Sequence, residues 1–137
     1  MRSLPTARFE PACYAALRAV SGALFAFHGA QKLFGWLSTK APPAVGSQLW
    51  VGGVIELIGG ALIAIGLFTR AAAFLCSGTM AVAYCQFHWK LALADWQWLP
   101  IVNKGELAVL YCFVFLFIWV HGPGIASFDR WRSAGRK

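Results

Sequence analysis

Residues 48–68 read QLWVGGVIELIGGALIAIGLF, and this apolar run decides the fold class. At 1.5 Å per residue, a helix over this run matches the hydrocarbon core of a bilayer, which is roughly 30 Å thick. Glu56 is the only charged residue in the run. The run therefore predicts a transmembrane helix over residues 48–68.

Three other runs share this character, at residues 11–36, 70–87 and 104–121. Isolated charges interrupt them, but polar stretches do not, and each approaches the ~20 residues that a membrane span needs. A tight hairpin with Thr69 as helix cap is expected between the second and third helices. The sequence predicts an all-α, integral membrane four-helix transmembrane bundle, in one domain over residues 1–137, with a basic tail over 122–137.

The composition points the same way. Of the 137 residues, 59% are hydrophobic and 12% are charged, whereas about 25% are charged in an ordinary soluble domain. A small soluble fold cannot bury that much apolar surface, so soluble enzymes and disordered chains are excluded. The net charge of +7 fits positive-inside anchoring better than nucleic-acid binding, because the basic residues lie between or beyond the apolar runs.

The distribution of Lys and Arg predicts the orientation. Seven basic residues fall on the side of the termini and the second-to-third hairpin: Arg2, Arg8, Arg70, Arg130, Arg132, Arg136 and Lys137. Four fall on the other side: Lys32, Lys40, Lys90 and Lys104. Because cytoplasmic loops carry the excess of Lys and Arg, we expect a multi-pass protein of the cell (inner) membrane with both termini in the cytoplasm.

The cysteines and histidines indicate no metal or disulfide site. Cys13, Cys76, Cys85 and Cys112 lie within or at the edges of apolar runs, and no CxxC occurs. Buried cysteines of this kind act as small hydrophobic residues. The three histidines, His28, His88 and His121, lack the spacing of metal ligands. No metal is therefore expected.

Five ionisable residues fall inside the predicted helices: Arg18, His28, Lys32, Glu56 and Glu106. Such groups are costly in a bilayer, so they usually face the bundle interior and find partners. Their depths along the predicted helices pair His28 with Glu56 and Lys32 with Glu106. Arg18 lies deeper towards the cytoplasmic side, and we expect it to extend towards the headgroups.

These pairs allow two interpretations. They can be ion pairs and hydrogen bonds that fix helix register, in which case they are structural. Alternatively, His28, Lys32, Glu56 and Glu106 form a ligand site for a polar head such as a quinone carbonyl, or a proton relay. In that second interpretation, interfacial Trp89, Trp96 and Trp98 could form a roof over the cavity.

The second helix also carries a face of small residues. At 100° per residue, Gly52, Glu56, Gly59, Ile63 and Gly66 fall within roughly 80°. Small residues let membrane helices approach closely. Gly52, Gly59 and Gly66 are therefore predicted to be helix-packing residues, and Glu56 to point into the bundle.

Several motifs along the chain, beginning with HGAQKLFG at 28–35 and ELIGGAL at 56–62, together resemble the DoxX family of small membrane proteins. HGAQKLFG at 28–35 resembles the end of that family's first helix, and ELIGGAL at 56–62 with GLFTRAA at 66–72 resembles its second helix and hairpin. NKGELA at 103–108, and GPG at 122–124 with SFD at 127–129, are similar to its fourth helix and terminus. Lys104 departs from the small residue that is more usual there.

The resemblance implies a four-helix membrane bundle and two kinds of function. Some relatives are linked to thiosulfate:quinone oxidoreductase and others to membrane-associated thiol and oxidative-stress complexes, whereas distant eukaryotic relatives act as assembly factors. We therefore expect a membrane subunit of a quinone- or thiol-linked redox system that binds a quinone or docks a soluble oxidoreductase. The alternative is a non-catalytic assembly, anchoring or structural subunit.

Cofactors and partners follow from these two hypotheses. The sequence has no haem, flavin or iron–sulfur motif, so no cofactor is encoded by a recognisable motif. Any catalysis would therefore belong to an oxidoreductase complex in which a membrane or soluble redox partner carries the cofactor. A homo-oligomer is compatible with the sequence. A transporter or channel is disfavoured, because four helices leave little room for a pore.

Overall fold

The protein is all-helical in the computed structural model, which describes residues 5–135. The helices are η1 (Pro5–Phe9), α1 (Glu10–Phe34), α2 (Gln48–Ile65), α3 (Thr69–Ala83), η2 (Tyr84–Trp89), η3 (Ala94–Trp96), α4 (Pro100–Asn103), α5 (Glu106–His121) and α6 (Phe128–Ala134). Four of them, α1, α2, α3 and α5, correspond to the four predicted helices. The all-α prediction is therefore confirmed.

The element bounds differ from the prediction mainly at the third helix. There α3 ends at Ala83, and the chain continues as the π-helix η2, so that the helical run reaches Trp89. Within the described residues, α2 is the one helix that is long and apolar enough to cross a membrane, and α5 is a shorter apolar helix. The short helices η3 and α4 lie in the connection between η2 and α5.

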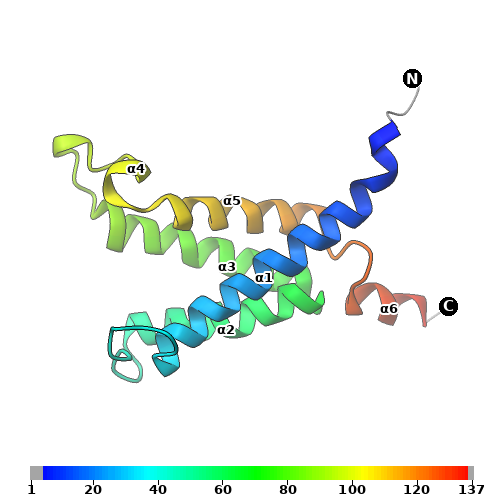
Figure 1. The fold of residues 1–137 in the computed structure, drawn as a ribbon, viewed down its shortest axis with the longest axis horizontal. Coiled ribbons are helices and arrows are strands. Elements are labelled where there is room, and N and C mark those ends of the chain that lie inside the picture. Colours follow the sequence, from blue (N-terminus) through cyan, green and yellow to red (C-terminus); the bar gives the residue numbers. More distant parts are fainter. Residues whose placement is uncertain (1–4, 136–137) are drawn as a thin grey trace.

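The bundle consists of two antiparallel helix pairs. α1 packs along α2, α3 packs along α5, and α2 joins the two pairs by contacting α3 (Figure 1). The beginning of α1 and the short helix α6 lie at one end of the molecule, and the α1–α2 loop and α4 lie at the other (Figure 1). The aromatic core lies between α1 and α5, where the rings of Phe25 and Phe115 are 4.7 Å apart.

Close backbone contact holds α1 against α2, and glycines make it possible. A Cβ at Gly22 would lie 2.5 Å from the Ala64 nitrogen, and one at Gly60 would lie 2.5 Å from the Ala26 nitrogen. Real Cβ atoms do not come so close to backbone atoms. Gly29 and Gly53 extend the same contact towards the other end of the helices. The two glycines of each helix are seven residues apart, which places them on one face.

The predicted small-residue face serves a different purpose. Gly59 faces Cys76 of α3, and Gly66 ends α2 in the left-handed conformation, with φ at 73°. Gly66 is therefore a helix terminator. It is also a packing residue, because a Cβ there would clash with the Cβ of Ser127. The packing role predicted for Gly52 is wrong, because no atom lies within 4 Å of its Cβ position. This face and the face that contacts α1 are offset by one residue, which is a rotation of about 100° around the axis of α2.

Arg18 is buried, which contradicts the expected position near the headgroups. Its side chain is 1% exposed and donates to the carbonyl oxygens of Ile63 and Ala64, at 2.6 and 2.7 Å, and of Ala126, at 2.7 Å. The last carbonyls of a helix lack intrahelical partners and form the negative end of its dipole. Arg18 thus satisfies the end of α2 and ties it to the segment before α6.

Asp129 of α6 caps the beginning of α3. Its carboxylate accepts hydrogen bonds from the backbone nitrogens of Phe68 and Thr69, at 2.9 and 2.8 Å, and from the Thr69 hydroxyl. The predicted cap by Thr69 is therefore wrong, and a residue far along the chain takes that role. Burial raises the pKa of Asp129, but the hydrogen bonds from Thr69 and Phe68 and the charge of Arg132 outweigh it and lower the pKa below its ordinary value.

Replacing Asp129 by alanine should destabilise the protein by about 1 kcal/mol at neutral pH, the usual effect of losing a helix cap. Because folding lowers this pKa, the contribution is present above the unfolded value of about 4 and is lost as the pH falls through the folded value. Unfolding in detergent from pH 7 to pH 3 measures this. Asp129→Asn, which keeps an acceptor, is the control. Equal stability of wild type and Asp129→Ala at pH 7 would contradict the capping role.

Candidate polar site in the α2–α3 groove

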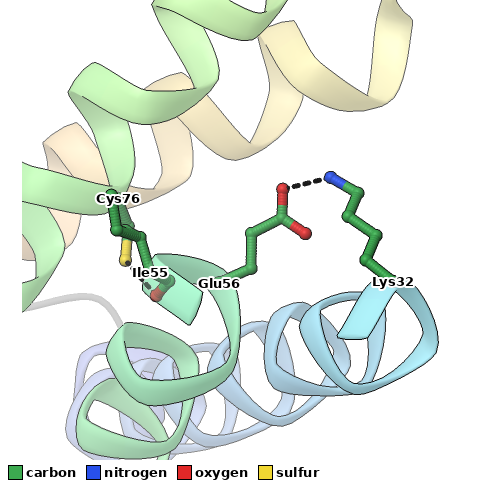
Figure 2. A network of polar contacts seen from close by, with 4 residues as sticks. All are labelled: Lys32, Ile55, Glu56 and Cys76. Carbon is green, nitrogen blue, oxygen red and sulfur yellow. Dashed lines mark hydrogen bonds and ion pairs between the residues drawn. The ribbon is translucent and has the colours of Figure 1, made fainter. Parts of the chain in front are cut away.

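The central polar contact of the bundle joins Lys32 to Glu56. Lys32 lies in the last turn of α1 and Glu56 in the middle of α2, and the Lys32 Nζ–Glu56 Oε1 distance is 2.5 Å (Figure 2). Glu56 is 2% exposed, whereas the Lys32 side chain is 42% exposed. The close approach of α1 and α2 at Gly53, one turn before Glu56, brings the two side chains together.

The structure corrects both predicted pairs. Glu56 is buried as expected, but its partner is Lys32 and not His28. His28 instead faces α5, where its ring centroid lies 6.2 Å from that of Tyr111. Glu106, expected to pair with Lys32, is exposed at the beginning of α5. Equal depth in the bilayer therefore did not identify the partners, because it does not specify which side of its helix each residue occupies.

The second oxygen of the Glu56 carboxylate has no partner. Glu56 Oε2 and Arg18 Nε are the two buried side-chain nitrogen or oxygen atoms without a hydrogen bond among the described residues. A buried acceptor without a donor is unfavourable, and native proteins contain few of them. The unpaired oxygen therefore marks Glu56 as a candidate functional residue.

An apolar groove lies between α2 and α3, with Lys32 and Glu56 among its lining residues. Its volume is about 390 Å³, and Gln48 adds a polar amide to its lining. The apolar wall is formed mainly by Val51, Ile55, Phe74, Leu75, Val82 and Phe87. The groove therefore combines an apolar channel with one ion pair, the combination typical of sites for amphipathic ligands.

Two glycines keep this groove open. Gly52 of α2 and Gly78 of α3 both line it, and a Cβ at either position would meet no atom within 4 Å. Larger side chains at these positions would enter the groove without touching the helix contacts. Gly78 was not among the predicted site residues, although it is the position from which α3 leaves space for a ligand.

The other predicted site residues lie elsewhere. Glu106 and Lys104 line a separate depression along α5. Trp89 and Trp98 line another pocket with Tyr84 and Leu93, and the lining of the groove includes none of the three tryptophans that were expected to cover it. Of the four predicted ligand-site residues, the structure thus brings Lys32 and Glu56 together and places His28 and Glu106 apart from them.

Within residues 5–135, no group of three or more His, Cys, Asp or Glu side chains is placed to hold a metal ion. All four cysteines in that part of the chain are free. Cys76 lies on the opposite side of α2 from Lys32, with its Sγ 4.0 Å from the Ile55 carbonyl oxygen (Figure 2). It packs α3 against α2 close to Glu56.

Comparison with known proteins identifies the family. The family model for DoxX matches residues 14–89, a segment that contains Lys32, Glu56 and the whole groove lining. An uncharacterized protein from Haemophilus influenzae is 41% identical over 125 residues, which is 89% of this chain and 92% of that protein. No solved structure matches the chain. On the strength of the family match and this relative, the chain belongs to the DoxX family.

Proposed function

We propose that this DoxX protein is an integral membrane subunit of a quinone- or thiol-linked redox system, and that its α2–α3 groove holds a quinone. The observation that carries the proposal is the Lys32–Glu56 pair in an otherwise apolar groove, with one carboxylate oxygen unpaired. A quinone combines a polar head with an apolar tail. The groove offers a matching surface for each part.

The residues of the groove suit the two parts of a quinone differently. An ammonium group has three donors, and Glu56 uses one from Lys32, so further donors remain for a carbonyl of the quinone head. Glu56 is a carboxylate placed to accept a proton at that position. The tail would lie along the apolar wall, to which Val51 of α2 and Phe74 of α3 both contribute.

The electrons of such a system come from a partner. A quinone accepts two electrons and two protons when it is reduced, and the side chains of this chain offer proton donors and acceptors but no redox centre of their own. The protein would bind and orient the quinone within the membrane. A docked oxidoreductase would supply the electron-carrying cofactor.

For the membrane arrangement we propose that α1, α2, α3–η2 and α5 each cross the bilayer, with the α6 end in the cytoplasm. The basic residues Arg8, Arg70, Arg130 and Arg132 belong to this end and support the orientation. Arg2, Arg136 and Lys137, which entered the sequence-based count, lie outside the described residues. The protein is then a multi-pass protein of the cell membrane.

Photo-crosslinking with a quinone analogue tests the binding site. We expect adducts to concentrate on the groove lining, and we expect Gly78→Leu to abolish them, because the new side chain enters open space in the groove. Ala71→Leu, which introduces the same side chain at an exposed position of α3 outside the groove, is the matched control and should leave labelling unchanged. Labelling that is spread over the outer surface of the bundle and is unaffected by Gly78→Leu would refute the site.

A further inference from the structure

The hydrogen-bonding state of Glu56 indicates which redox form of the ligand the groove prefers. An ionised carboxylate is purely an acceptor, and both of its oxygens need donors when they are buried. Lys32 serves Oε1, and nothing serves Oε2. A ligand that brings a donor would therefore complete this site.

Apart from Lys32, the hydroxyl and amide groups of the groove each donate to another group of the protein. The Thr79 hydroxyl donates to the Leu75 carbonyl oxygen at 2.8 Å, and the Gln48 amide donates to Gln86. The remaining wall is apolar, and the interior backbone nitrogens of α2 and α3 are engaged in their own helices. A hydroxyl group on a ligand is therefore a suitable donor for the unpaired oxygen of Glu56.

A donor in the groove can reach the carboxylate after a small movement. The terminal torsion of a glutamate is broad, so a partial rotation that turns the unpaired oxygen towards the groove costs little. The Lys32 side chain is partly exposed, which lets its ammonium move towards the groove while it keeps contact with one oxygen. The second oxygen then becomes available to a ligand head.

We infer that the groove binds the quinol form in preference to the quinone form, because only the quinol brings a hydroxyl donor for the unpaired oxygen of Glu56. This inference rests on the proposed function. Lys32 can donate to an oxygen of either form, so it does not discriminate between them. Glu56 can accept a hydrogen bond from a quinol hydroxyl, whereas a quinone carbonyl beside it leaves the carboxylate oxygen without a donor.

Equilibrium binding of one compound in its two redox forms tests the preference. The probe is a para-benzoquinone with a decyl tail and its chemically reduced quinol, titrated anaerobically into the full-length protein in detergent and followed by tryptophan fluorescence. A hydrogen bond to a charged acceptor predicts that the quinol binds at least about tenfold more tightly. Glu56→Gln should remove this ratio, since an amide offers both a donor and an acceptor.

The outcomes distinguish a failure of the quinol preference from a failure of the proposed quinone site. Equal affinities of the two forms, or tighter binding of the quinone, would overturn the inferred quinol preference but would still support the quinone site. Binding of neither form to the wild-type protein would overturn both. The wild-type ratio is decisive by itself, so the test does not depend on whether Glu56→Gln folds.

Discussion

Replacing Gly60 by alanine should destabilise the bundle by about 3 kcal/mol, the upper part of the range for overpacking a close contact. The added methyl group would lie 2.5 Å from the Ala26 nitrogen and 2.6 Å from the Gly22 carbonyl oxygen. These are backbone atoms in the middle of a helix, so they cannot move aside as a side chain can. The two helices would have to separate and lose contact along their length.

Unfolding in detergent measures this loss, and two other glycines of the same bundle provide the controls. Gly52→Ala and Gly78→Ala place the same methyl group in open space. Alanine favours a helix more than glycine does, so neither control should lose stability. If Gly60→Ala were as stable as these two variants, the close contact between α1 and α2 would be wrong.

Replacing Lys32 by alanine should be the second large effect, with a loss of about 3 kcal/mol. It leaves the buried carboxylate of Glu56 without its only partner, and an unpaired buried charge is strongly destabilising. Glu56→Ala should cost less, because the partly exposed Lys32 ammonium that remains can turn away from the bundle. The two members of one ion pair are thus expected to differ.

A double-mutant cycle checks this asymmetry. The double variant Lys32→Ala, Glu56→Ala should be more stable than Lys32→Ala alone. The reason is that it also removes the buried Glu56 carboxylate, which Lys32→Ala leaves unpaired. Additive losses, or a Glu56→Ala variant less stable than Lys32→Ala, would contradict the ion pair as described. His28→Ala is a suitable reference, since among the described residues His28 makes no hydrogen bond or ion pair with Lys32 or Glu56.

The helices were predictable from the sequence because long apolar runs determine them locally. Four runs gave four principal helices with bounds close to the observed ones, and the hairpin at Gly66 followed from glycine at a helix end. The π-helix η2 was not predicted. Its first residue, Tyr84, accepts a hydrogen bond from Asn103, a contact that the residue types of the run do not reveal.

The partners of the buried charges were not predictable in the same way. The expected depths of His28 and Glu56 agreed, but the rotation of α1 directs His28 to α5 and Lys32 to α2. That rotation is set by the glycine contact between α1 and α2. The seven-residue spacing of Gly22 with Gly29, and of Gly53 with Gly60, was a signal that could have identified the contact face and hence the rotation.

Few features of the sequence indicate the groove. Glu56 was a candidate because a carboxylate in an apolar helix needs an explanation. Nothing about Gly78 distinguishes it from a packing glycine until α3 is placed against α2. Arg18 illustrates the same limit, because its three carbonyl partners come from two segments that lie far from it in the sequence.

Native mass spectrometry of the protein extracted in mild detergent tests the central claim most directly, since it reports bound ligand, partner chains and copy number together. We expect the wild-type protein to retain one quinone or quinol per chain and Gly78→Leu to retain none, while Ala71→Leu behaves like wild type. A wild-type protein that carries no quinone but holds a stoichiometric partner chain would contradict the quinone site. That result would favour an assembly or anchoring subunit instead.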